Sequence, residues 1–139
     1  MIIIRQFHDE DVLEIQNFDK DFPLVVKECH GKGWIHVAIV DNTIVGYFAL
    51  LKGQEPAYFD ENITNWAEIR EVHVHPRFQR QGIGTLLTKF ALDLAKSEGF
   101  LRVYVCTDDF NQVAQKTYLN CGFRELNRII RYRFVYNSK

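Results

Sequence analysis

A predicted strand, a basic turn and two glycines that open a helix follow one another in the stretch Val74-His75-Pro76-Arg77-Phe78-Gln79-Arg80-Gln81-Gly82-Ile83-Gly84. Gly82 and Gly84 have no side chains, so an anion can approach the backbone closely at both positions. The first N–H groups of the following helix have no acceptor inside it and lie at the positive end of its dipole. Arg77 and Arg80 add flanking positive charge. The stretch therefore predicts a binding site for a pyrophosphate.

Two common phosphate-binding motifs do not fit this stretch. The Rossmann fingerprint G-x-G-x-x-G requires a third glycine at position 87, which is Leu87. The P-loop requires Gly-Lys-Ser or Gly-Lys-Thr after its spacer, and the sequence contains neither. A G-x-G pair alone is equally compatible with an ordinary tight turn, so the prediction of a pyrophosphate site depends on the residues around the glycines.

The periodicity of apolar residues divides the chain into strands and helices. Strands are predicted at residues 2–6, 34–40, 43–51, 66–75, 101–106, 123–126 and 129–136, and helices at residues 9–19, 22–30, 84–98 and 111–120. A strand–helix–strand unit over residues 66–106 implies a parallel pair with a right-handed crossover, whereas the hairpins on either side imply antiparallel neighbours. We therefore expect an α/β (α+β) fold with a mixed, mostly antiparallel sheet of six to seven strands, flanked by about four helices.

Length and composition indicate one globular domain spanning residues 1–139. Hydrophobic residues make up 47% of the chain and charged residues 25%, which excludes disordered and collagen-like proteins. The net charge of -1 gives no general attraction to nucleic acid or to anionic membranes. No apolar run approaches the ~20 residues of a membrane span, and the N-terminal isoleucines are too few for a signal peptide. We therefore expect a cytoplasmic protein with no nucleic-acid or membrane partner.

The cysteines and histidines give no support to a metal site. Cys29, Cys106 and Cys121 are odd in number and form no C-x-x-C pair, which argues against a zinc knuckle or a disulfide framework. Cys106 is expected to be buried in a strand. His73 and His75 form an H-x-H pair, but a metal site needs a third ligand and only three other histidines remain. We therefore expect no metal cofactor.

The opening stretch resembles the signature of the GNAT superfamily, V-x-P-x-[YF]-[RQ]-x-x-G-[ILV]-[GA]. Every defined position is filled, by Val74, Pro76, Phe78, Gln79, Gly82, Ile83 and Gly84. A second block, Asn111-x-x-Ala114-x-x-x-Tyr118-x-x-x-Gly122-Phe123, resembles the family's N-x-x-A-x-x-x-Y-x-x-x-G-F. The resemblance covers nearly the whole chain, although the first half matches no particular subfamily. It implies an acetyl-CoA-dependent N-acetyltransferase that acts on a primary amine by direct attack in a ternary complex.

The resemblance also implies which residues hold acetyl-CoA. The cofactor would enter a gap between the strand before the loop and the strand after its helix. Its pantetheine arm would pair with the free strand edge at Val72, His73 and Val74, as an added β-strand does. Asn111 and Tyr118 would contact it from the opposite wall. The pyrophosphate would be held by Gln79, Arg80, Gln81, Gly82, Ile83, Gly84 and Thr85.

Three side chains are candidates for proton transfer. Tyr118 would protonate the leaving CoA thiolate as a general acid, the alternative being an aromatic core residue at helical spacing. Glu68 and Glu71 lie in the strand where members of the family often carry an acidic base. They are three positions apart, so only one faces the cleft unless a bulge intervenes. His73 shares a face with Glu71, and a water chain to bulk solvent is an alternative to any side-chain base.

Other functions stay open at this point. A GNAT-like module could bind acyl-CoA as a sensor without turnover, and a metal-dependent hydrolase could use His73 and His75. The acceptor could be a protein N-terminus, a lysine, a polyamine or a small amine, and the protein a monomer or a homodimer. Acidic and aromatic residues that suit a cationic amine lie in segments that usually shape the family's acceptor pocket, namely Glu28, Tyr58, Phe59, Asp60 and Glu61. A solvated loop explains these residues equally well.

Overall fold

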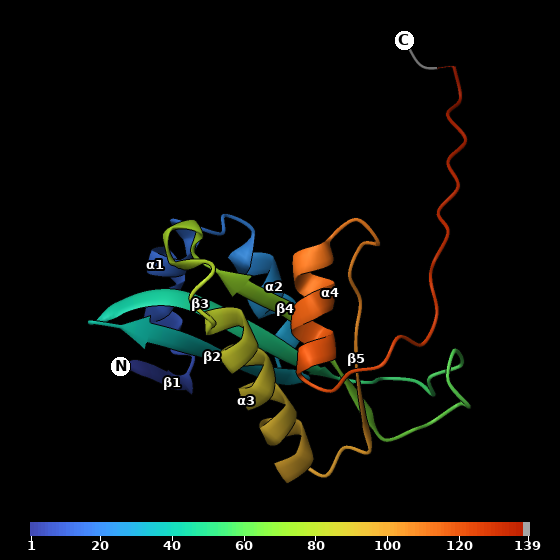
Figure 1. The fold of residues 1–139 in the computed structure, drawn as a ribbon, viewed down its shortest axis with the longest axis horizontal. Coiled ribbons are helices and arrows are strands. Elements are labelled where there is room, and N and C mark those ends of the chain that lie inside the picture. The colour runs from blue at the N-terminus through green and yellow to red at the C-terminus, as the bar shows by residue number, and fades with distance from the viewer. Residues whose placement is uncertain (138–139) are drawn as a thin grey trace. The chain divides into compact units, whose positions relative to one another are not determined.

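A computed structural model describes residues 1–137 of the protein, which contain one five-stranded sheet (Figure 1). The spatial order of the strands follows the chain: β1 (Ile2–Gln6), β2 (Gly33–Val40), β3 (Thr43–Lys52), β4 (Trp66–Val74) and β5 (Arg102–Val105). Neighbours from β1 to β4 are antiparallel, and β4 and β5 are parallel. The expected mixed, mostly antiparallel sheet is therefore confirmed.

The chain forms two compact units, Met1–Cys106 and Thr107–Lys139. The first unit contains the sheet, and the second contains α4 (Gln112–Asn120). The expectation of a single domain over residues 1–139 stays a prediction. Within residues 1–137, no helix has the length and apolar character needed to cross a lipid bilayer.

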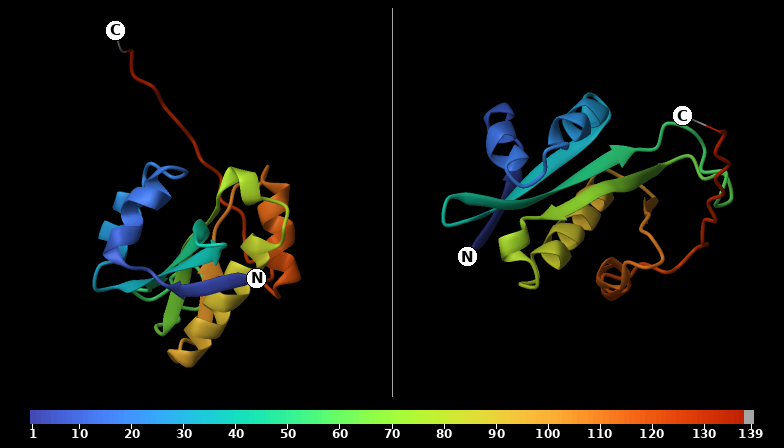
Figure 2. Two further views of the ribbon diagram at one scale, coloured as in Figure 1. Left: turned by 90° about the vertical axis from the view of Figure 1, so that its left-hand side faces the viewer. Right: turned by 90° about the horizontal axis from the view of Figure 1, so that it is seen from above.

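Helices cover both faces of the sheet in the first unit. On one face lie α1 (Val12–Gln16) and α2 (Phe22–Cys29), and on the other lies α3 (Ile83–Ser97) (Figure 2). The helix predicted over residues 9–19 is shorter than expected. It begins as a 3-10 turn, η1 (Asp9–Asp11), and ends at Gln16 before the chain turns into α2.

A cluster of buried side chains fills the space between α1, α2 and the sheet. Ile15, Phe22 and Tyr47 are fully buried there, and the rings of Phe22 and Tyr47 lie 4.7 Å apart in an edge-to-face contact. On the opposite face, Leu87 and Ala91 of α3 are fully buried. Burying a large apolar side chain contributes roughly 1.5–3 kcal/mol, so this core holds β3 and β4 in fixed positions.

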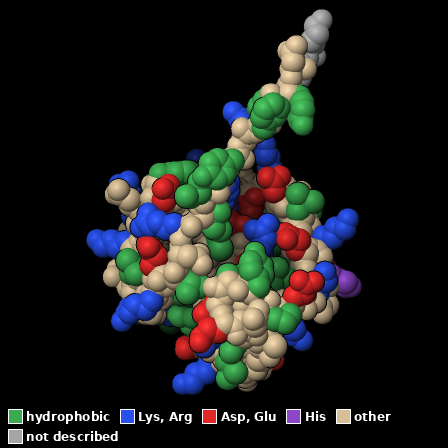
Figure 3. Space-filling view, turned by 90° about the vertical axis from the view of Figure 1, so that its right-hand side faces the viewer, with side chains coloured by type: hydrophobic (Ala, Val, Ile, Leu, Met, Phe, Trp, Pro, Cys, Tyr) green, Lys and Arg blue, Asp and Glu red, His purple; other side chains and the backbone are tan. Residues whose placement is uncertain are grey.

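The predicted C-terminal hairpin is wrong. The described residues after Gly122 contain neither strand 123–126 nor strand 129–136, so the sheet has five strands instead of six to seven. Apolar side chains along this segment are exposed (Figure 3), namely Leu126, Ile129, Ile130, Tyr132, Phe134, Val135 and Tyr136. An alternating pattern favours an extended backbone, but a strand also requires a partner to complete its hydrogen-bond ladder.

The placement of Cys106 also differs from the expectation of a buried strand residue. β5 ends at Val105, and Cys106 is exposed. The strand is only four residues long because its pairing with β4 stops at Val105. Cys29, by contrast, is buried, and burial raises the pKa of its thiol to about 11. The Cys29 thiol is therefore protonated and unreactive at neutral pH.

Candidate cofactor and acceptor sites

The loop after β4, where the pyrophosphate site is expected, has an irregular and open backbone. A 3-10 turn, η2 (Pro76–Phe78), follows the strand, and Gln79 Nε2 donates a hydrogen bond of 3.2 Å to the carbonyl of Val74. Arg80 and Gly82 both adopt left-handed conformations, with φ of 65° and 81°. Gly82 is the N-cap residue of α3. A Cβ placed at Gly82 would meet no atom within 4 Å, so the space beside this backbone is open.

This loop brings the predicted pyrophosphate residues 79–85 together at the N-terminal end of a 15-residue helix. Ile83 is buried and anchors the first turn, whereas Gln79, Arg80 and Gln81 are exposed. The N–H groups of the first turn of an α-helix lack acceptors within the helix, and its dipole favours an anion there. The arrangement therefore fits a phosphate group with basic side chains beside it.

The second half of β4 offers an edge to which an extended ligand could add. Pairing between β4 and β5 runs only from Trp66 opposite Arg102 to Ile69 opposite Val105. β4 continues to Val74, so residues 72–74 pair with β3 on one side only among the described strands. The free edge leads directly into the loop at residues 79–85, as the expected path of pantetheine and pyrophosphate requires.

A β-bulge changes which side chains of β4 share a face. The pairing of β3 with β4 slips by one position at Arg70, which has no residue opposite it. Glu68, Glu71 and His73 therefore all lie on the face covered by α1 and α2, opposite Leu51, Ala49 and Tyr47. The expectation that only one of the two glutamates faces the cleft applied to a regular strand, and the bulge is the exception that it named. Periodicity in the sequence contained no signal for the bulge.

Both glutamates bind a proton more readily than exposed carboxylates do. Burial raises the pKa of Glu68, and the nearby Arg70 guanidinium partly opposes the shift. Burial also raises the pKa of Glu71, with His73 and Arg70 acting in the opposite direction. Half-buried carboxyl groups with raised pKa values are typical of functional sites, although structural ion pairs also shift pKa values.

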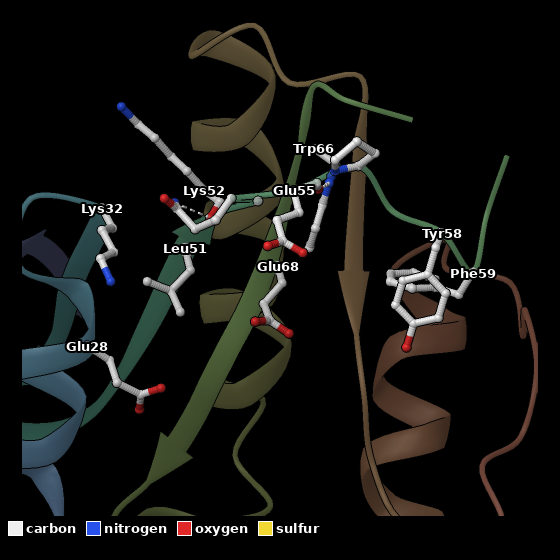
Figure 4. Close-up of a pocket in the computed structure, with 12 residues that line it drawn as sticks. Glu28, Lys32, Leu51, Lys52, Glu55, Tyr58, Phe59, Trp66 and Glu68 are labelled. Carbon is white, nitrogen blue, oxygen red and sulfur yellow. Dashed lines mark hydrogen bonds between the residues drawn. The ribbon is translucent and has the colours of Figure 1, made fainter. Parts of the chain in front are cut away.

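A pocket of about 390 Å³ lies beside Glu68 at the first half of β4 (Figure 4). Lys52 also lines it, but Figure 4 shows this side chain pointing away, and its Nζ lies 5.5 Å from the centre of the Trp34 ring. Lys32 is the other cation of the lining. Carboxylates and aromatic rings make up much of the rest, namely Glu28, Glu55, Glu68, Tyr58, Phe59 and Trp66.

Three of these residues, Glu28, Tyr58 and Phe59, were expected to shape the acceptor pocket, whereas Asp60 and Glu61 have a different role. Arg102 donates to Asp60 at 2.8 Å and lies 3.2 Å from Glu61. The Tyr104 hydroxyl donates to Asp60 at 2.6 Å, and it is the main cause, with Arg102, of the lowered pKa of that carboxyl. Asp60 and Glu61 thus tie the loop of residues 53–65 to β5. Sequence reasoning missed Glu55 and Trp66.

The family model described as the acetyltransferase (GNAT) family matches residues 4–123. The chain belongs to the GNAT family. A search of curated protein sequences finds no match.

Solved structures share the fold of this GNAT chain. AAC(6')-Iy in complex with the bisubstrate analogue CoA-S-monomethyl-acetylneamine has a TM-score of 0.79 and 17% identity, over 97% of this chain and 99% of that chain. A transcriptional regulator from Bacillus halodurans C-125 has a TM-score of 0.77 and 20% identity, over 96% and 100%. The aminoglycoside antibiotic 6'-N-acetyltransferase AAC(6')-IG from Acinetobacter haemolyticus has a TM-score of 0.76 and 13% identity, over 97% of this chain and 99% of that chain. At these identities the likeness shows the fold alone.

The other block of the GNAT resemblance lies in the second unit. The Asn111 side chain accepts a hydrogen bond of 3.1 Å from the Ala114 N–H and so caps α4. The ring of Tyr118 packs edge-to-face against Phe123, with centroids 5.7 Å apart. The contacts of Asn111 and Tyr118 with the cofactor stay predictions.

The described part of the chain also contains no cluster of three or more histidine, cysteine or acidic side chains placed to hold a metal ion. His75 instead accepts a hydrogen bond of 3.1 Å from the Arg77 N–H through its Nδ1. This contact shapes the start of the loop after β4.

Proposed function

We propose that this GNAT domain transfers the acetyl group of acetyl-CoA to a primary amine by direct attack in a ternary complex. The observation that carries the proposal is the continuity between two features, the free edge of β4 at residues 72–74 and the open loop at residues 79–85. Together they provide backbone donors for a pantetheine arm and then for a pyrophosphate, in the order in which CoA presents them.

The chemistry follows from this placement. A backbone N–H at residues 72–74 would donate to the thioester oxygen as it gains charge, and one such donor contributes roughly 3 kcal/mol. The amine nitrogen forms a bond to the carbonyl carbon, the bond from carbon to sulfur breaks, and the electron pair leaves on the thiolate. In this proposal the Tyr118 hydroxyl protonates the departing sulfur.

We further propose that the acceptor carries more than one cationic amine, of which one binds in the pocket beside Glu68 while another reaches the thioester at residues 72–74. Carboxylates attract a cation, and aromatic faces add cation–π attraction of roughly 0.5–2 kcal/mol. Two of the structural neighbours are named aminoglycoside acetyltransferases, and aminoglycosides carry several amines. The pocket of this chain suits ligands of the same charge type.

Acetyl-CoA should stabilise the folded protein. A ligand at 100 times its dissociation constant adds roughly 2.7 kcal/mol, which thermal unfolding would record as a higher Tm. Acetyl-pantetheine, which lacks the pyrophosphate, is the matched control and should produce a much smaller shift. An unchanged Tm at millimolar acetyl-CoA would contradict cofactor binding.

An acetylation screen tests the acceptor, with release of free CoA thiol as the readout. Spermidine, kanamycin and a lysine peptide are expected to react better than aniline, which is uncharged at neutral pH. In Glu68→Gln, the KM of cationic amines should rise about tenfold, because a charged hydrogen bond contributes roughly 1.5–3 kcal/mol. Glu98→Gln, an exposed position at the end of α3, should behave like the parent.

The same screen separates the competing roles. A fall in kcat instead of a rise in KM in Glu68→Gln would make Glu68 the base. Binding of acetyl-CoA without thiol release for any amine would favour an acyl-CoA sensor. The observation that favours a regulatory sensor is that one neighbour with the same fold is named a transcriptional regulator.

A further inference from the structure

A cluster of Asp19, Tyr47 and His73 lies between the α1–α2 connection and the sheet, close to the free edge of β4. The Tyr47 hydroxyl donates a hydrogen bond of 2.5 Å to Asp19 Oδ2. Asp19 Oδ1 accepts from the Asp21 N–H at 3.3 Å, so both carboxylate oxygens are held. Burial and the hydrogen bond to Asp19 raise the pKa of Tyr47, which keeps its hydroxyl protonated and able to donate. The cluster is therefore fixed from the side of β3.

His73 completes the cluster from β4. Its ring is stacked on that of Tyr47, with centroids 5.8 Å apart and planes at 4°. Its Nδ1 lies 3.7 Å from Asp19 Oδ2, an ion-pair distance when the imidazole is protonated. The His73 side chain is 31% exposed, whereas that of Asp19 is 14% exposed. The carboxylate is thus well shielded, while the imidazole retains access to solvent.

The Nδ1 side of the His73 ring faces the Asp19 carboxylate at 3.7 Å, without a direct hydrogen bond in this structure. A proton on Nδ1 would point toward that carboxylate and leave the lone pair on Nε2 at the opposite side of the ring. The titratable groups that interact with the ring are Asp19 from the α1–α2 connection, Tyr47 from β3 and Glu71 from β4. The Phe18 ring lies against those of both His73 and His75, with centroids 5.7 Å and 5.0 Å apart.

We propose that His73 is the general base that accepts the proton of the acceptor amine, and that Asp19 is the positioning residue that orients its imidazole. The inference rests on the proposed acetyl transfer. His73 lies within residues 72–74, where the thioester would bind. A strand rises roughly 3.3 Å per residue, so Glu68 lies too far along β4 for direct transfer. Glu71 is nearer, but its carboxylate lies 3.8 Å from the Arg70 guanidinium.

The proton balance is as follows. His73 Nε2 takes one proton from the ammonium form of the acceptor and later releases it to solvent. The neutral amine attacks the thioester carbonyl, and the bond from carbon to sulfur breaks. The amide nitrogen loses a second proton, and the thiolate gains one to leave as CoA thiol. The net products are the acetylated amine, CoA thiol and one proton.

The experiment measures kcat against pH for whichever of spermidine and kanamycin turns over, at saturating acetyl-CoA. The parent should lose activity at acid pH as its base is protonated. In His73→Gln, kcat should fall about 100-fold and the acid limb should disappear. In Asp19→Asn, kcat should fall about tenfold with KM unchanged, and Asp19→Glu should recover part of that loss, because the imidazole has lost the carboxylate that orients it. Exposed His30 provides the control His30→Gln, which should match the parent.

An unchanged kcat in Asp19→Asn, or a loss that appears in KM instead of kcat, would overturn the role of Asp19. An active parent whose acid limb survives in His73→Gln, or vanishes only in Glu71→Gln, would overturn the role of His73. A parent that acetylates no amine and does not hydrolyse acetyl-CoA would contradict the proposed function itself, and with it the assignment of His73 as the general base.

Discussion

Replacing Gly82 with valine should weaken acetyl-CoA binding at least about 100-fold, equivalent to roughly 2.8 kcal/mol, and leave a folded protein. The open space beside Gly82, where a Cβ would now project, is where the pyrophosphate is expected to lie. The φ of 81° adds a cost of roughly 1–2 kcal/mol for any residue with a side chain, which a typical domain tolerates. Calorimetric titration with CoA and the far-UV circular dichroism spectrum together measure both effects.

Gly99 provides a matched control for this substitution. It also has a positive φ, of 88°, and a Cβ there would meet no atom within 4 Å, but it lies just beyond the opposite end of α3. Gly99→Val should therefore destabilise the fold by a similar amount and bind CoA as the parent does. If Gly82→Val binds CoA as tightly as the parent, the pyrophosphate does not lie on this loop.

Replacing Tyr118 with phenylalanine should reduce kcat at least about tenfold and leave the dissociation constant for acetyl-CoA nearly unchanged. Only the hydroxyl is removed, so the edge-to-face contact with Phe123 is preserved. A proton donated to the departing thiolate matters in the transition state, so its loss affects turnover more than binding. Steady-state kinetics with any amine that turns over, alongside calorimetry with CoA, separates the two quantities.

Tyr132→Phe is the control for the loss of a phenol, because Tyr132 is 91% exposed. It should have the kcat of the parent. An unchanged kcat in Tyr118→Phe would assign Tyr118 a packing role in the second unit and leave solvent to protonate the thiolate. A weaker affinity for CoA with unchanged kcat would instead identify Tyr118 as a binding residue.

Local patterns in the sequence were enough to place the elements that surround the loop. The apolar stripe predicted a helix over residues 84–98, and α3 spans Ile83–Ser97. The hairpin predicted around residues 41–42 forms, with left-handed Asp41 and Asn42 at its turn. These features depend on neighbouring residues, through helical periodicity and turn chemistry, so the sequence contains the information directly.

The sequence by itself also determined the family and the order of strand, loop and helix that a pyrophosphate site requires. Only the tertiary structure decided which charged groups meet. The bulge at Arg70 places Glu68, Glu71 and His73 on one face, and the packing of the α1–α2 connection against β3 and β4 brings Asp19 to His73. The C-terminal alternation predicted strands that do not form. Strand pairing, bulges and ion pairs between distant residues depend on which segments come together, and residue periodicity does not encode that.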